Sequence, residues 1–323
     1  MPSARNQFIE LFEQNKIASE NITAALTASN VSPTNQSWHT FINHLLLWVG
    51  SLSLAFSGMF FIAYNWTELG YLSKFAMVEA VLILTILGYW KIGHNTIGGK
   101  VSLLMATIFL GVLLALFGQT YQTGADPWQL FFNWAMLMLP WALIGRFSAI
   151  WLVWLLLINL TIVLYHQAFR NVIWLLFSSD TQLMWLLYIF NTAALVVWQI
   201  LAKKWLWLQQ NWAIRTIATA SGVLITWLVI FNIFDERGTQ GLAVTVWAIW
   251  MAVLYWVYRK ISPDLFMLAG FCLSGIVVIT SYQTQLLIND LNAGSLLFIA
   301  FLIIGLSTGA AIWLKNVHRE LQQ

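Results

Sequence analysis

Apolar runs long enough to cross a membrane recur along almost the whole chain. A helix needs roughly 20 residues to cross the hydrocarbon of a bilayer. Such runs predict ten spanning helices, over residues 41–64, 72–91, 101–121, 128–145, 147–166, 182–202, 214–234, 240–258, 263–283 and 294–314. The composition agrees, because 60% of the residues are hydrophobic and 8% are charged, whereas about a quarter of the residues in soluble domains are charged. The sequence therefore predicts an all-α fold, a polytopic transmembrane helix bundle.

The placement of lysine and arginine predicts the orientation of these helices. With the N-terminus in the cytoplasm, twelve of the 15 basic residues fall on the cytoplasmic side, and Lys74, Arg170 and Arg237 fall on the outer side. Cytoplasmic loops carry an excess of positive charge, and this bias sets the orientation. We therefore expect both termini in the cytoplasm and the connection 119–127 on the outer, periplasm-like side.

Three parts of the chain differ in character. Residues 1–40 are polar, and apolar positions at helical spacing predict two short amphipathic helices on the membrane surface or on a partner. A loosely ordered tail is the alternative. Residues 41–166 hold the first five spans, and residues 167–323 hold the second five with a short C-terminal tail. The first forty residues lack the pattern of a cleavable signal peptide, so the first span is expected to direct insertion. The apolar piece 172–177 is too short to span.

A polar stretch between the third and fourth spans carries several local signals. Asp126 followed by Pro127 predicts a helix start, because proline is tolerated in the first turn and aspartate accepts bonds from the free amides there. Gly124 gives the preceding turn its conformational freedom. Pro140 is expected to kink the helix that follows. We interpret Asp126 as a cap, and a ligand role is the alternative.

Two motifs in this part of the chain resemble a known family. FIAYNW at residues 61–66 and FGQTYQTGADPWQLFFNWAMLMLP at residues 117–140 are similar to bacterial predicted membrane proteins grouped as domain of unknown function 2157. The resemblance covers roughly residues 41–166. It implies a location in the bacterial inner membrane, and it supplies no activity, cofactor or catalytic residue.

Polar residues near the outer end of the first four spans are the candidate site. Glu79 lies about 10 Å below the outer end of the second span, at 1.5 Å per residue. Ionisable groups inside a membrane mark functional sites by default, so Glu79 is a candidate proton-titrating carboxylate or cation ligand. A hydrogen-bonded structural acid is the alternative. The amide of Gln119 could join two helices or contact a solute. The candidate pocket residues are Asn65, Glu79, Gln119, Tyr121, Gln122 and Asp126.

Small residues at four-residue spacing predict where helices pack. Such residues let backbones approach closely in lipid. They occur at Thr107, Gly111, Ala115 and Gln119 in the third span, at Gly270 and Ser274 in the ninth, and at Gly305 and Gly309 in the tenth. Asn133 and Asn159 are expected to form interhelical hydrogen bonds rather than to bind a ligand.

Two functions fit these patterns. The leading hypothesis is a membrane protein that binds or transports a small solute through a polar pocket open to the outer side. The alternative is a non-catalytic scaffold that recruits a protein partner through residues 1–40. The lipid bilayer is the expected environment, and no basic stripe indicates nucleic acid. No motif indicates a cofactor, and neither a nucleophile motif nor metal-ligand spacing among the histidines supports catalysis.

Overall fold

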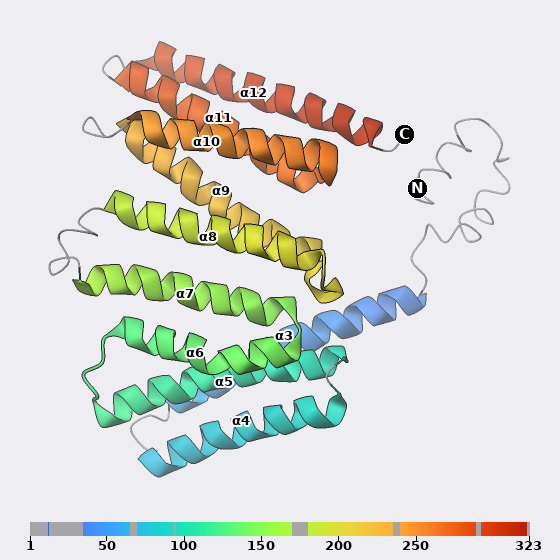
Figure 1. The fold of residues 1–323 in the computed structure, drawn as a ribbon, viewed down its shortest axis with the longest axis vertical. Helices are drawn as coiled ribbons and strands as arrows, with labels where there is room; N and C mark the ends of the chain where they lie inside the picture. The colour runs from blue at the N-terminus through green and yellow to red at the C-terminus, as the bar shows by residue number, and fades with distance from the viewer. Residues whose placement is uncertain are drawn as a thin grey trace. The chain divides into compact units, whose positions relative to one another are not determined.

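A computed structural model describes Phe12 and residues 35–64, 70–93, 95–169, 180–234, 240–288 and 292–321. These residues form ten long helices and no strand, which confirms the all-helical fold (Figure 1). The helices are α3 (Asn35–Tyr64), α4 (Tyr71–Ile92), α5 (Ile97–Tyr121), α6 (Pro127–Gly145), α7 (Ser148–Phe169), α8 (Asp180–Ala202), α9 (Asn211–Phe234), α10 (Gln240–Trp256), α11 (Leu265–Leu287) and α12 (Ala293–Glu320). A 3-10 turn, η2 (Leu206–Leu208), precedes α9, and a π-helical turn, η3 (Val257–Ile261), follows α10.

Nine of these ten helices, α10 counted together with η3, are long and apolar enough to cross a membrane, judged within the described residues. The tenth is α6, whose 19 residues include Gln129, Asn133 and Pro140. These residues lower its hydropathy, although a helix of this length extends about 28 Å at about 1.5 Å per residue. Nine predicted spans thus correspond to helices that are candidates for crossing a membrane, and the spanning of α6 stays a prediction.

The chain divides into two compact units. Unit 1 comprises Met1–Phe109 and His318–Gln323, and unit 2 comprises Leu110–Val317. In unit 1, Gly58 of α3 lies against the ring of Phe109, and Gly88 of α4 lies against Ser102. Glycines therefore sit where α3 and α4 approach α5. The predicted boundaries after residues 40 and 166 stay predictions.

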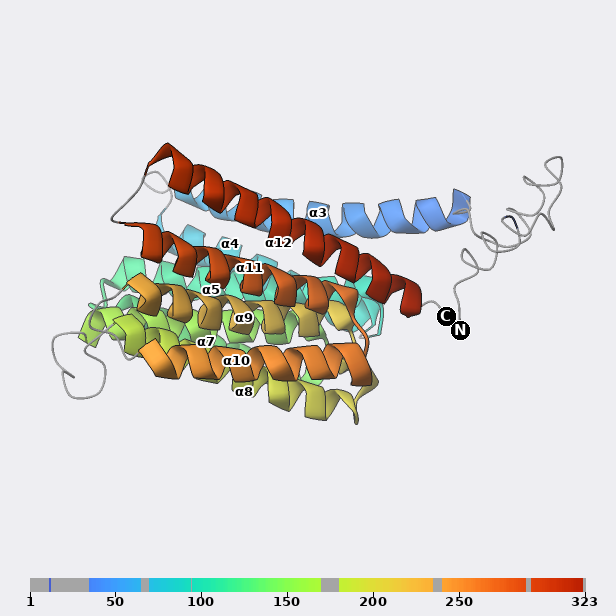
Figure 2. The same ribbon diagram turned by 90° about the horizontal axis from the view of Figure 1, so that it is seen from above.

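Unit 2 is built around α9. Neighbouring helices pack in chain order, α6 on α7, α7 on α8 and α8 on α9, and α9 also contacts both α10 and α11. Figure 2 shows α9 between α10 and α11. The ring of Trp313 brings α12 against Tyr255 and Phe271. Three helices, α9, α10 and α11, thus meet at one place in this unit.

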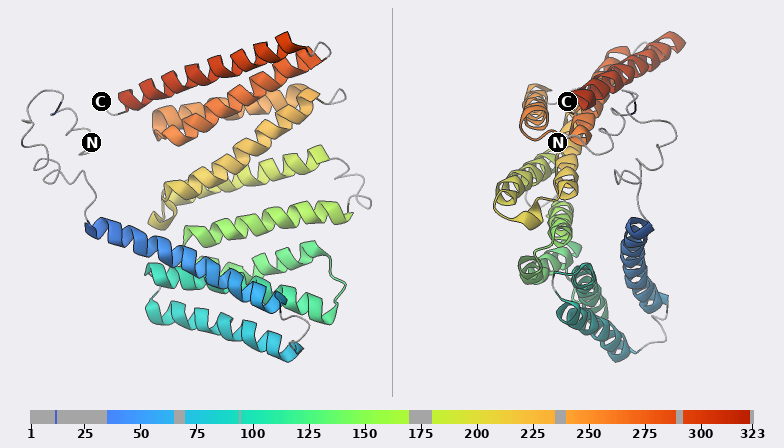
Figure 3. Two further views of the ribbon diagram at one scale, coloured as in Figure 1. Left: turned by 180° about the vertical axis from the view of Figure 1, so that it is seen from behind. Right: turned by 90° about the vertical axis from the view of Figure 1, so that its right-hand side faces the viewer.

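Successive connections of unit 2 lie at alternate ends, as the left view of Figure 3 shows. Arg146, in the left-handed region with φ 44°, turns the chain between α6 and α7. The Ser148 hydroxyl donates to the Trp207 carbonyl over 2.8 Å, which places this turn beside η2. Arg215 of α9 pairs with Asp264, just before α11, over 2.9 Å.

The described lysines and arginines of unit 2 all lie toward this one end, which we call the basic end. It carries Arg146, Lys203, Lys204, Arg215, Arg259, Lys260 and Lys315. The helix order agrees with the alternation that the charges predict. The side of the membrane that the basic end faces, and with it the cytoplasmic location of the termini, stays a prediction.

Polar side chains join several helices of unit 2. Asn191 of α8 donates to Asn159 of α7 over 2.6 Å, and Asn159 returns a bond of 3.3 Å. The interhelical bond expected of Asn159 is thus confirmed. Thr192 and Ser221 make a hydroxyl contact of 2.5 Å between α8 and α9. Asn133, by contrast, has an exposed side chain on α6.

The small residues predicted to lie at helix contacts have three different environments in the structure. Gly111 of α5 is buried, and a Cβ there would overlap the indole ring of Trp134 on α6. Ser274 of α11 bonds to α9. On α12, however, a Cβ added at Gly305 or Gly309 would have no heavy atom of a neighbour within 4 Å. The expected helix packing is therefore wrong for these two glycines among the described residues.

Candidate functional site

The six residues proposed from the sequence lie in different parts of the chain. Asn65 falls outside the described residues. Glu79 belongs to unit 1, where its side chain is exposed on α4, while Lys74 of the same helix is 7% exposed. The two groups therefore lie on different faces of α4. The other four candidates belong to unit 2.

Those four residues are close together in sequence around the α5–α6 connection. Gln119, Tyr121, Gln122 and Asp126 all have exposed side chains. Gln122 and Gly124 take left-handed backbone conformations, with φ 43° and 65°, and so reverse the chain between the two helices. The four polar groups therefore form an exposed surface at the end of unit 2 opposite the basic end (Figure 1).

Asp126 differs from its expected role as a capping residue. It occupies the N-cap position of α6 and Pro127 occupies the first turn, as predicted. The Asp126 side chain, however, makes no capping hydrogen bond. The capping interpretation is therefore correct for the position and wrong for the carboxylate. An exposed carboxylate loses little by pointing into solvent rather than toward the helix amides.

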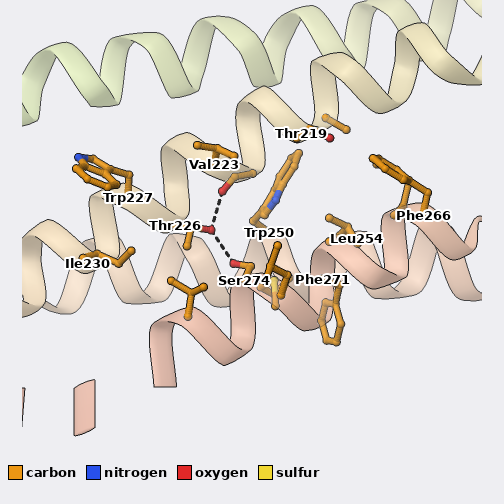
Figure 4. Close-up of a pocket in the computed structure, with 17 residues that line it drawn as sticks. Thr219, Val223, Thr226, Trp227, Ile230, Trp250, Leu254, Phe266, Phe271 and Ser274 are labelled. Atoms are coloured by element: carbon orange, nitrogen blue, oxygen red, sulfur yellow. Dashed lines mark hydrogen bonds between the residues drawn. The ribbon is translucent and has the colours of Figure 1, made fainter. Parts of the chain in front are cut away.

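A pocket of about 320 Å³ lies where α9, α10 and α11 meet. Figure 4 shows its lining side chains. Trp227 and Ile230 of α9 lie at one end and Phe266 of α11 lies at the other, with Trp250 of α10 between them. The volume falls in the usual range for small-molecule sites, about 300 to 1,000 Å³.

Hydrogen bonds tie the helices together at the base of this pocket. Thr226 of α9 and Ser274 of α11 bond through their hydroxyls over 2.6 Å, and Trp247 of α10 donates to the Ser274 oxygen over 2.9 Å. The Thr226 hydroxyl also lies 2.7 Å from the Gly222 carbonyl, to which it donates. With the Thr226 proton given to Gly222, the Ser274 proton goes to Thr226, so every donor of this group has an acceptor.

Two glycines leave the pocket open. A Cβ added at Gly270 of α11 would have no heavy atom of a neighbour within 4 Å. A Cβ added at Gly222 of α9 would meet only the Trp250 indole nitrogen, at 3.8 Å. Side chains at these positions would occupy the cavity. Because the hydrogen bonds between Thr226, Ser274 and Trp247 hold the helices at this spacing, the missing side chains leave a space that the helices do not close.

One side of the pocket faces outward from unit 2. Val223 is 60% exposed, Trp227 is 55% exposed and Leu273 is 62% exposed, while Met267 at the inner wall is 4% exposed. The pocket is therefore a groove open on one side of unit 2 rather than a closed cavity.

Other hollows exist in unit 2. One of about 510 Å³ lies between α6, α7, α8 and η2, and it is walled by aromatic rings such as Trp151 and Trp154. The indole nitrogens of these two rings are inaccessible and have no acceptor among the described residues. Another of about 580 Å³ lies over α10, α11 and α12. The α9–α11 pocket differs from both in the hydroxyl pair at its base.

Sequence reasoning identified only part of this site. It marked Gly270 and Ser274 as a packing stripe but left out Gly222 and Thr226, which have the same four-residue spacing on α9. The matching small-residue patterns on two helices were the available signal. No metal centre adds to the site, since the described residues contain no group of three or more His, Cys, Asp or Glu that could hold an ion.

Comparison with known proteins bears on the first part of the chain. Neither a curated protein nor a solved structure matches the chain. A family model matches residues 10–151, so the match includes the motifs at 61–66 and 117–140 and ends near the start of α7. The pocket between α9 and α11 lies beyond this match. Residues 10–151 are thus similar to the family described as Predicted membrane protein (DUF2157).

Proposed function

We propose that this multi-pass membrane protein binds a small, largely apolar solute in the pocket between α9, α10 and α11. The observation that carries the proposal is a cavity of about 320 Å³ with hydrogen-bonded hydroxyls and with exposed apolar side chains along one side. Small-molecule sites are typically concave, mostly apolar and supplied with a few polar groups.

The chemistry of the walls favours hydrocarbon over a polar solute. Most of the lining is aliphatic or aromatic, and the donors of Thr226, Ser274 and Trp247 are already paired. An apolar ligand therefore leaves the donors of Thr226, Ser274 and Trp247 satisfied, whereas an unsatisfied buried donor would cost about 1–3 kcal/mol. The exposed side chains along the groove provide a route from the bilayer without passage through water.

Photolabelling tests the proposal. The protein is reconstituted in phosphatidylcholine vesicles, labelled with a diazirine-bearing long-chain alcohol, and mapped by peptide mass spectrometry. We expect saturable labelling of residues 218–230 and 266–277. Gly270→Leu fills the cavity and should reduce this labelling at least about tenfold, since a lost apolar contact of 1.4 kcal/mol already changes affinity by that factor. Gly305→Leu is the matched control, because Gly305 also has open space but lies on α12.

Two results would contradict this proposal. Labelling that rises linearly with probe concentration would show only contact with bulk lipid. Equal labelling in the wild type, Gly270→Leu and Gly305→Leu proteins would show that the groove does not hold the probe.

The exposed polar residues at the other end of unit 2 support a second proposal. Gln119, Tyr121, Gln122 and Asp126 would bind or pass a small solute on the periplasmic side of a bacterial inner membrane, with both termini in the cytoplasm. Glu79 and Asn65 belong to unit 1 and are separate candidates for the same role. The gathering of four exposed polar groups around one connection favours it. Glu79→Gln or Gln119→Ala should then abolish solute binding while expression and detergent stability are unchanged. Wild-type binding in both folded variants would exclude these residues.

The scaffold function remains the alternative. It depends on residues 1–40, of which the structure describes Phe12 and 35–40. Deletion of residues 1–35 separates it from solute binding: a scaffold loses its partner in a pull-down, whereas a solute-binding protein keeps its photolabelling.

A further inference from the structure

We propose that the α9–α11 pocket holds one acyl chain of an anionic phospholipid, whose headgroup lies at the Arg215 end. The inference rests on the proposed function and names the class of ligand. The proposed lipid belongs to the leaflet on the same side of the membrane as the basic end.

The length of the groove fits a chain in one leaflet. On α9 the lining runs from Ala218 to Ile230, and on α11 it runs from Phe266 to Val277. At 1.5 Å per residue these stretches are about 18 Å and about 16 Å long. The hydrocarbon core of a bilayer is about 30 Å thick, so the groove matches about half of it. A small compact solute would leave much of this length unused.

A cation lies at one end of the groove. Phe266 closes the pocket there, and the guanidinium carbon of Arg215 lies 5.4 Å from the centre of its ring. Arg215 is three residues before Ala218, or about one helical turn toward the basic end. This arrangement places a positive charge at the depth where the headgroup of a lipid with its chain in the groove would lie.

Arg215 keeps donors for a second partner. Its Nε and one Nη donate to the two carboxylate oxygens of Asp264, over 2.9 and 3.1 Å. A guanidinium has five N–H donors, so three have no acceptor among the described residues. The Arg215 side chain is 40% exposed, whereas that of Asp264 is 11% exposed. Arg215 thus has donors and surface available to a phosphate.

The carboxylate of Asp264 does not cancel the attraction of the basic end for an anionic headgroup. Its Oδ1 also accepts from the Phe266 amide over 2.9 Å and so caps α11. It is the only carboxylate at the basic end among the described residues of unit 2, where seven lysines and arginines lie. Lys203, Lys204 and Lys260 are exposed there. The local field therefore favours an anionic headgroup over a zwitterionic one.

Native mass spectrometry of the purified full-length protein tests this ligand class. Phosphatidylglycerol and phosphatidylcholine with identical chains are titrated separately, and the first tightly bound lipid is quantified. We expect the wild type to prefer phosphatidylglycerol about fivefold, the factor for roughly one basic residue acting near a membrane surface. Arg215→Gln should lose this preference. Gly270→Leu should lose tight binding of both lipids, and Gly305→Leu should behave as wild type.

Additional measurements keep the outcomes distinct. Arg215→Gln/Asp264→Asn removes both charges without leaving a lone buried carboxylate, and it should also lose the preference while its thermal unfolding is cooperative. Equal binding of the two lipids by the wild type, with saturable alcohol labelling intact, would overturn the lipid assignment and leave the proposed function standing. Lipid binding and labelling that are both insensitive to Gly270→Leu would overturn both. Displacement of phosphatidylglycerol by inorganic phosphate alone would show an anion site that does not need the chain.

Discussion

Gly111 and Gly270 show the same sequence signal with opposite structural results. Each is one of several small residues spaced four apart along an apolar helix. At the α5–α6 contact, the Trp134 ring lies against Gly111 and fills the space beside it. At the α9–α11 contact, no side chain fills the space beside Gly270, and a pocket forms.

The difference comes from the facing helix rather than from the glycine. Small residues permit close approach of helices in lipid. Where the facing residue is as large as tryptophan, its ring takes the room and the contact is packed. Where the facing residues are Thr226 and Trp250, and hydroxyl bonds hold the helices at a fixed spacing, the room stays open. The first glycine therefore belongs to a packed helix contact, and the second borders the pocket proposed to bind a ligand.

The largest effect on stability is expected for Gly111→Ala. The added methyl group overlaps the Trp134 ring, and overpacking of this kind costs about 1–3 kcal/mol. Unfolding in detergent, followed by denaturant titration, measures the change. Gly118→Ala is the matched control on the same helix, because a Cβ there meets nothing within 4 Å. Equal stability of the two variants would show that the Gly111–Trp134 contact is not tight.

A smaller loss is expected for Asn191→Leu. Asn159 then loses its side-chain partner on α8, and interhelical hydrogen bonds in membrane proteins contribute roughly 0.6 kcal/mol and at most about 1.7 kcal/mol. The double variant Asn159→Leu/Asn191→Leu should recover part of the loss, because no amide is left unpaired. The same unfolding titration measures both, and an additive loss in the double variant would rule out the pairing.

The smallest effect, and of opposite sign, is expected for Gly270→Ala. Alanine is favoured over glycine in a helix by up to about 1 kcal/mol, and its methyl group meets no neighbour here. The variant should therefore be slightly more stable than wild type while its alcohol labelling falls only modestly. Destabilisation would mean that the space beside Gly270 is already filled, and the contrast with Gly111 would disappear.

Much of the fold follows from hydrophobicity alone. The run 214–234 predicts a span, and the structure has α9 at Asn211–Phe234. Helix boundaries differ most at α3, predicted to begin at residue 41 but beginning at Asn35, and at α12, predicted to end at residue 314 but extending to Glu320. Hydropathy marks where the hydrocarbon ends, and the backbone can continue as a helix beyond it. Lys315 and His318 therefore belong to the helix without belonging to an apolar run.

Sites were harder to predict than helices. Asn159 was expected to bond between helices, but its partner Asn191 depends on which helices are neighbours and in which register. The polar connection 119–127 is obvious in the sequence because its residues are contiguous. The pocket draws on Thr226, Trp250 and Ser274 from three helices, and none of them stands out alone. A site of this kind depends on the spacing of helices, which residue patterns do not specify.

A density map of the full-length protein in nanodiscs containing phosphatidylglycerol tests the central claim most directly. The account predicts an elongated density in the groove between α9 and α11, running from the level of Phe266 toward Ile230 and ending in a headgroup beside Arg215. A groove closed by side chains, or occupied by another helix of the chain, would contradict it.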